Sequence, residues 1–303
     1  MSQPNDAPES RFRCALSAGA EHLAGSAAAD AAYLLVEYPG AWGKKALAES
    51  ALPEHVRDGL AEAADRAGVR VQLIRRHGRN PRGEAFRVFL GSAAPDDAWL
   101  ETTVLEVADD LLDLDLDGLA EGRRPGLEPH DEPLLLVCTN GRRDACCAEF
   151  GRPIVAALTA AHPLQTWETT HVGGHRFAGA MLTLPHGFSY GRLDSTSALA
   201  VAASTLAGRL VVEHLRGRTA YAPAVQAAEV ALLAELGDDA ADALSLVDVQ
   251  VDEDGRHRVG FRHRTGERVV TVDVEAGPPV RASCADTRVK ATKRFVTRVE
   301  PSA

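Results

Sequence analysis

The stretch LLLVCTNGRRDACCAEFGRPIVAALTAAHPLQTWETT, residues 134–170, decides the fold. It begins with an apolar run typical of a buried strand, continues through a turn-rich segment into an apolar stretch of helical length, and ends in a second short strand. Consecutive strands joined by one helix usually pair in parallel through a right-handed crossover. The sequence therefore predicts a parallel strand pair whose following loops leave the same edge of one sheet.

These two loops hold cysteines and histidines. The first, CTNGRRDACC, contains Cys138 and the adjacent pair Cys146 and Cys147, and the second, TTHVGGH, contains His171 and His175. Thiolates and imidazoles each offer a lone pair to a metal, and thiolate suits zinc or iron-sulfur centres. We expect Cys138, one of the paired cysteines and both histidines to converge.

The spacing of these residues differs from that of a zinc finger. Zinc-finger cysteines lie two to four residues apart, whereas eight residues separate Cys138 from Cys147. The two glycines between the histidines disfavour a helix and let backbone approach a bulky centre closely. A 2Fe-2S cluster with two cysteines on one iron and two histidines on the other would use the ligands of Rieske centres, although each Rieske loop gives one Cys and one His.

The segments CTNGRRDACC and TTHVGGHRFAG, the latter running into LPHGFSYGRL, resemble the sucrase/ferredoxin-like family, whose cluster domain is a thioredoxin-like ferredoxin. The similarity extends more loosely to AYLLVEYPGAWG. The resemblance implies a 2Fe-2S cluster held by Cys138, Cys147, His171 and His175. Ala180 departs from the pattern, because many relatives have Asn after Phe-Ala-Gly.

The resemblance implies an electron carrier rather than a stand-alone enzyme. Its one-electron transfer would run between a reductase and an acceptor protein, and histidine ligation should raise the potential and couple the transfer to protonation. The two cysteines would hold the more buried iron. Arg142, Arg143 and Arg176 flank the loops, where they could offset the charge of the cluster, dock a partner or simply serve solubility.

Three alternatives remain from the residues alone. The same four ligands would also bind a structural zinc ion. The run from Gly187 to Gly191 matches G-x-S-x-G, so Ser189 with Asp194 and His214 would permit a serine hydrolase, although alternation across the run favours a strand over a nucleophile elbow. Cys146 and Cys147 could form a thiol redox pair, but they lack Cys-x-x-Cys spacing.

The order of elements indicates an α/β fold. We expect a thioredoxin-like ferredoxin domain packed with a related N-terminal α/β half, and a small α+β tail module. The predicted domains are 1–120, a linker at 121–132, 133–217 for the ferredoxin domain, and 218–303 for the tail. Within them we predict a helix from Asp194 to about Arg216, two helical stretches in 223–246 and a three-stranded meander. The basic end, RVKATKRFVTR, would be a solvated tail or a docking patch for an acidic partner, and we favour the tail.

Composition limits the partners. The formal charge of −10 disfavours nucleic acid, and no uncharged stretch reaches the roughly 18 apolar residues of a membrane span. The polar start, MSQPNDAPESRFR, lacks the features of a signal peptide and predicts a cytoplasmic protein. Five cysteines make a disulfide framework improbable, and Cys14 and Cys284 are expected to be small packed residues.

Overall fold

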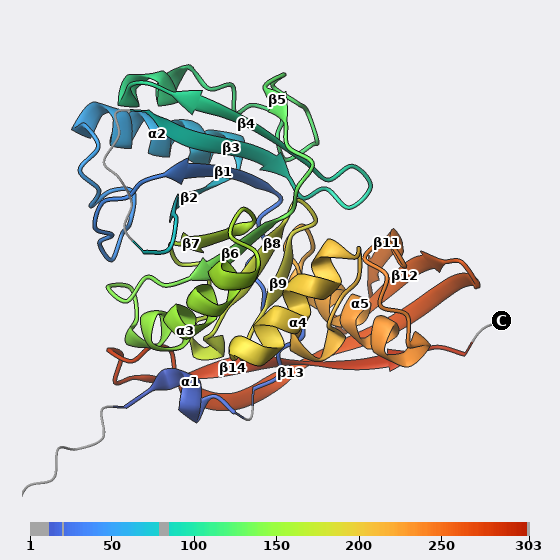
Figure 1. Ribbon diagram of the computed structural model, residues 1–303. Helices are drawn as coiled ribbons and strands as arrows, with labels where there is room; N and C mark the ends of the chain where they lie inside the picture. The colour runs from blue at the N-terminus through green and yellow to red at the C-terminus, as the bar shows by residue number, and fades with distance from the viewer. Residues whose placement is uncertain (1–11, 20, 79–84, 302–303) are drawn as a thin grey trace, which may run out of the picture.

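The parallel strand pair expected from residues 134–170 is confirmed in the computed structural model (Figure 1). The structure describes residues 12–19, 21–78 and 85–301. Strands β6 (Leu134–Cys138) and β7 (Thr166–Thr169) pair in parallel, and helix α3 (Ala145–Ala161) connects them. Cys138 lies opposite Thr169 in the register, so the cysteine and histidine loops leave the sheet at the same edge.

The expected hairpin lies on the other side of β6. Strand β8 (Met181–Leu184) runs antiparallel to β6, and β9 (Phe188–Tyr190) runs antiparallel to β8. Helix α4 (Ser195–Leu206) follows, and the side chain of its N-cap residue Asp194 accepts a hydrogen bond of 2.8 Å from the backbone of Ser197. The four strands therefore lie in the order β9–β8–β6–β7.

The end of α4 differs from the sequence prediction. The helix stops at Leu206 and not near Arg216. Gly208 follows in the left-handed region, with φ of 69°, a conformation that commonly ends helices. A 3-10 turn at Val212–His214 then leads into β10 (Leu215–Arg218), which pairs with β9.

The first half of the chain repeats the strand order of the second half. Its four strands lie as β2–β1–β3–β4, which corresponds position by position to β7–β6–β8–β9. After the short helix α1 (Cys14–Ser17), the elements are β1 (Ala32–Glu37), α2 (Glu54–Ala67), β2 (Val69–Arg75), β3 (Phe86–Ser92), β4 (Trp99–Leu105) and a 3-10 turn at Ala108–Asp113. The segment predicted as a linker contains a short strand, β5 (Glu128–Pro129), which pairs with β4.

The two halves share one ten-stranded mixed sheet, because β2 pairs antiparallel with β7. At this junction Arg75 donates two hydrogen bonds, of 3.0 and 2.8 Å, to the buried carboxylate of Glu168. Burial alone would raise the pKa of Glu168, but the hydrogen bonds from His77 and Arg75 outweigh it and lower that pKa. A charged network therefore fixes the N-terminal half against β7.

Over its described residues, up to 301, the C-terminal module contains one helix and four strands, where two helical stretches and three strands were predicted. The chain forms α5 (Pro223–Leu236), β11 (Ser245–Val251), β12 (His257–His263), β13 (Gly266–Arg281) and β14 (Val289–Val299). Gly237 ends α5 in the left-handed region, with φ of 61°. The basic end RVKATKRFVTR forms most of β14 and pairs with β13, so it is not a solvated tail.

The small antiparallel sheet packs against helices α3, α4 and α5 rather than standing apart from them. Buried Val259, Phe261, Val270 and Val272 from β12 and β13 belong to the same apolar core as residues of α3, α4 and α5. In Figure 1 the long β13 and β14 extend from the region of α5 towards α1. The connection between them, residues 282–288, contacts α1 and the cysteine loop, because Cys284 accepts from the Cys14 amide at 3.5 Å and donates through its own amide to Asp144 at 2.8 Å.

Candidate metal centre

The two thiols of the predicted site come from the end of β6 and the first turn of α3. Cys138 and Cys147 are each 2% exposed. Gly151 lies one turn after Cys147 on the same helix face, and a Cβ there would come within 2.2 Å of the carbonyl oxygen of Cys138. The absence of a side chain at Gly151 therefore lets α3 approach β6 and brings the two thiols together.

The two histidines lie on a loop, as the glycines predicted. Residues 171–174 are irregular, and a single 3-10 turn begins at His175. Gly173 and Gly174 adopt φ values of 87° and 67°, which other residues rarely adopt. Two side chains of β2 hold the carbonyl oxygen of His171: Arg70 donates to it at 3.0 Å and Gln72 at 3.3 Å. The N-terminal half thus positions the histidine loop.

Three of the four predicted ligands meet at one point. The Nδ1 atom of His171 lies 3.9 Å from the Sγ of Cys138 and 3.7 Å from the Sγ of Cys147, and these three atoms all lie within 4.8 Å of one another. His175 lies one step farther out, with its Nδ1 atom 3.4 Å from the Nε2 atom of His171. Both imidazoles are half-buried, so the group runs from buried thiols to more accessible histidines.

Hydrogen bonding assigns the roles of the ring nitrogens. The Nε2 atom of His175 contacts the carbonyl oxygen of Ala282, and because a carbonyl only accepts, this nitrogen carries the hydrogen. The Nδ1 atom of His175 then accepts from Nε2 of His171, and the Nδ1 atom of His171 faces the two sulfur atoms. Ala282, in the β13–β14 connection, therefore orients both imidazoles.

The two thiols ionise unequally. The hydrogen bond from Cys147 is the largest influence on Cys138 and, with the contact to His171, lowers the pKa of Cys138. The same hydrogen bond, followed by burial, raises the pKa of Cys147. One thiolate is favoured in the metal-free site, and binding a cation would favour the second by offsetting its charge.

Cys146 faces away from this group. Neighbouring residues on a helix are rotated by about 100° from each other, so Cys146 and Cys147 point in different directions. Cys146 gathers with Cys14, Asp144 and Cys284 in a second group whose ligand atoms lie within 4.8 Å of one another. The expectation that Cys14 and Cys284 are only small packed residues is therefore incomplete, because both contact a carboxylate and other thiols.

Arg216 is a residue of the site that sequence reasoning missed. It is fully buried, and it donates to the carbonyl oxygen of Gly173 at 3.0 Å and to Oγ of Ser189 at 3.3 Å. Burial lowers the pKa of its guanidinium to about 10, which still leaves it charged at neutral pH. The neighbouring sequence did not indicate that Arg216 is buried or contacts the histidine loop, because the predicted helix extended to about this position.

Within residues 85–301 no hydrogen bond joins the Ser189 hydroxyl to the His214 ring, and that hydroxyl accepts from Arg216 instead. Ser189 is buried in the middle of β9 and not at a sharp turn into a helix. The Asp194 carboxylate is engaged in capping α4. The strand position differs from that of a nucleophile elbow.

Four other residues named in the sequence analysis lie near the cysteine and histidine loops. Arg142 and Arg143 are exposed, whereas Arg176 donates two hydrogen bonds, of 2.7 and 2.8 Å, to the carboxylate of Glu21. Ala180 is buried, and its backbone carbonyl accepts from the Cys138 amide at 3.0 Å. Arg176 therefore has a structural partner, while Arg142 and Arg143 are available at the surface.

The fold is a mixed sheet covered by helices, and cysteine and histidine side chains gather where β6 and β7 end. These features define a candidate metal-binding protein. The chain belongs to the sucrase/ferredoxin-like family, whose sequence model matches residues 23–217. Over 56 residues it is 38% identical to altered inheritance of mitochondria protein 32 of Kluyveromyces lactis, an alignment that covers 18% of this chain and 17% of that protein. No solved structure matches the chain.

The described helices also bear on the membrane prediction. None of those in residues 12–19, 21–78 and 85–301 is long and apolar enough to cross a bilayer. Residues 1–11, on which most of the signal-peptide argument rests, lie outside the described residues.

Proposed function

We propose that the protein is an electron carrier that holds a 2Fe-2S cluster through Cys138, Cys147, His171 and His175. The observation that carries the proposal is the meeting of two buried thiols with the Nδ1 atom of His171, backed by His175, in a chain of this family. Two thiolates and two imidazoles form a donor set suited to such a cluster. When bound, the cluster would supply one-electron redox chemistry.

The order of burial supports the division of ligands predicted from the sequence. Cys138 and Cys147 are enclosed by protein, whereas His171 and His175 are half-buried. In this proposal the cysteines hold the inner iron and the histidines hold the outer one. The histidine rings would then also carry the exchangeable protons, so we propose that electron transfer is coupled to protonation.

The repeated strand order supports a further part of the proposal. In each half the third strand runs antiparallel to the first, and the second runs parallel to it. We propose that both halves are thioredoxin-like and that the second half is the ferredoxin domain. The N-terminal half would act as a scaffold, because Arg70 and Gln72 hold the His171 carbonyl.

A basic pocket offers a place for the redox partner. A cavity of about 200 Å³ beside His171 is lined by Lys44, Arg70 and Arg143, among other residues. Positive charge at this rim would favour an acidic partner surface and bring it close to the outer histidines. We propose that a reductase or acceptor protein docks here.

A single zinc ion is the second candidate. His171 Nδ1 lies at similar distances, 3.9 and 3.7 Å, from the two sulfur atoms. Tetrahedral zinc, with bonds of about 2.3 Å to sulfur and about 2.0 Å to nitrogen, places such ligands about 3.5 Å apart. In this alternative His175 would supply the fourth ligand, and the closed four-ligand site would be structural.

Anaerobic reconstitution of the full chain separates the two candidates. With iron and sulfide the cluster proposal predicts visible absorbance, acid-labile sulfide and a reduction potential that falls with rising pH. His171→Ala should abolish the sulfide content, and the matched variant His186→Ala, which changes a histidine outside the site, should retain it. Bound zinc that is lost in His171→Ala but retained in His186→Ala, with no acid-labile sulfide, would overturn the cluster proposal in favour of zinc at this site. A pH-independent potential would overturn the proton coupling.

A further inference from the structure

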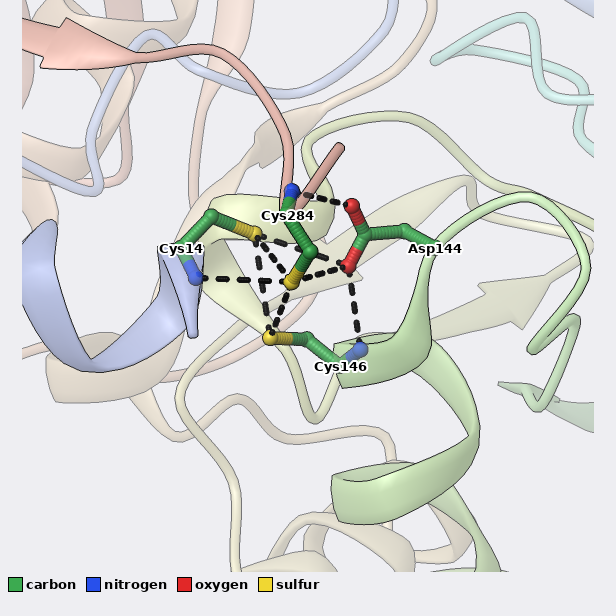
Figure 2. Close-up of side chains that lie close together, drawn as sticks. All are labelled: Cys14, Asp144, Cys146 and Cys284. Carbon is green, nitrogen blue, oxygen red and sulfur yellow. Dashed lines mark hydrogen bonds between the residues drawn. The ribbon is translucent and has the colours of Figure 1, made fainter. Parts of the chain in front are cut away.

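A second group of metal-binding side chains lies on the other face of the first turn of α3. Cys14 comes from α1, Asp144 and Cys146 from the start of α3, and Cys284 from the β13–β14 connection (Figure 2). The three sulfur atoms point towards one another and towards the Asp144 carboxylate. Three segments that are far apart in the sequence thus place four ligand atoms in one small volume.

The distances match the edges of a single-ion site. The sulfur atoms of Cys14, Cys146 and Cys284 are separated by 3.7, 3.3 and 3.6 Å. The Oδ1 atom of Asp144 lies 3.5 Å from the sulfur of Cys14 and 3.0 Å from that of Cys284. Tetrahedral zinc, with bonds of about 2.3 Å to sulfur and about 2.0 Å to oxygen, requires edges of about 3.8 Å and about 3.5 Å. A small outward shift of the side chains would complete the tetrahedron.

The environment of the carboxylate favours a cation over simple packing. Asp144 is only 4% exposed, and a buried carboxylate needs compensation. The backbone amides of Cys146 and Cys284 donate to it at 3.0 and 2.8 Å, but no described cationic side chain forms an ion pair with it.

The geometry favours a single ion over the main rival arrangements. A two-iron cluster needs two ligand pairs on either side of its sulfide bridge, whereas all three sulfur atoms here lie within 3.7 Å of one another. A disulfide would join only two of the three thiols and leave the third beside the carboxylate. Three thiolates and one carboxylate are instead a donor set suited to a closed tetrahedral zinc site.

We propose that Cys14, Asp144, Cys146 and Cys284 bind one structural zinc ion. The ion would fasten α1 and the β13–β14 connection to the N-terminus of α3. Ala282, whose carbonyl orients His175, lies only two residues before Cys284. Zinc at this second group therefore also fixes the connection that covers the first site, although the proposal does not depend on what the first site binds.

Zinc binding can be measured in full-length protein that lacks the first site. In a Cys138→Ser, His171→Ala background, reduced and stripped of metal, we expect one equivalent of Zn²⁺ to bind. Adding Cys284→Ser or Cys14→Ser should remove that equivalent, and the neighbouring control Ser283→Ala should keep it. Co²⁺ as a spectroscopic probe should give thiolate-to-cobalt charge-transfer absorption that weakens with each cysteine removed.

A variant that preserves the fold guards against loss of binding through unfolding. Asn is as good an N-cap as Asp, so Asp144→Asn should leave α3 intact by circular dichroism while weakening Zn²⁺ binding at least tenfold. The proposal is wrong if the background protein binds no Zn²⁺, if binding survives Cys284→Ser and Cys14→Ser, or if anaerobically purified protein contains a Cys146–Cys284 disulfide. Failure of iron-sulfur reconstitution in the native sequence would leave these outcomes unchanged.

Discussion

Replacing Gly151 with alanine should test whether the approach of α3 to β6 assembles the first site. The added Cβ would lie 2.2 Å from the Cys138 carbonyl oxygen, and real Cβ atoms essentially never come closer than 3.0 Å to another heavy atom. The helix face must therefore retreat by at least about 0.8 Å. Overpacking costs about 1–3 kcal/mol, and alanine returns at most about 1 kcal/mol of helix propensity. We expect a net loss of about 1–2 kcal/mol in the free energy of unfolding, because the clash is with backbone.

The displacement should also reduce metal binding, because Cys147 lies on the same face one turn earlier. Urea denaturation measures the stability, and acid-labile sulfide per chain after reconstitution, or zinc if that candidate holds, measures the site. The control Gly59→Ala changes another helical glycine, where the nearest atom is Cδ2 of the half-exposed Leu112 at 2.9 Å, which can turn aside. A Gly151→Ala protein with native stability and native metal content would refute the argument.

Three further predictions concern buried charges. Glu229→Ala should lower the free energy of unfolding by about 3–5 kcal/mol, as measured by urea denaturation. The substitution leaves the buried Arg218 guanidinium, 3.0 Å from that carboxylate, without its partner. A loss below about 1 kcal/mol would contradict this. Stability should fall on acidification below about pH 4.3, the unfolded pKa of Glu, because Glu168 has a lowered pKa in the folded protein. Glu168→Gln should flatten that dependence, and an unchanged slope would count against the junction network. Arg216→Met should make the reduction potential of a reconstituted cluster more negative, because a buried positive charge near the thiolates is lost. Spectroelectrochemistry measures this shift. An unchanged or raised potential would contradict the prediction.

The local parts of the fold were predictable because their signals are local. The strand–helix–strand order of residues 134–170 determined the parallel pair, and the glycines beside His171 and His175 determined a loop. The Asp194 cap and the hairpin before it also follow from neighbouring residues. The spacing of eight residues favours Cys147 over Cys146 as the second thiol, and in the structure Cys147 lies beside Cys138 and His171, whereas Cys146 lies in the other group.

The parts that sequence reasoning missed depend on distant contacts. Arg216 interacts with Gly173 and Ser189 through the folded sheet, and nothing near it in the sequence indicates burial. Cys14 and Cys284 are 270 residues apart, yet their sulfur atoms lie 3.6 Å from each other. The basic segment of β14 resembled a solvated tail because its charged side chains remain exposed while its backbone pairs with β13.

The two histidines of the first site depend on different parts of the chain. His171 is held through its carbonyl by Arg70 and Gln72 from the N-terminal half, whereas His175 is held through its ring by Ala282 from the C-terminal module. Residues 133–217 supply all four proposed ligands but neither of these supports. Since a ligand's orientation depends on the groups that hydrogen-bond to it, the flanking parts should set the geometry of the histidine side, while β6 and α3 set that of the thiols.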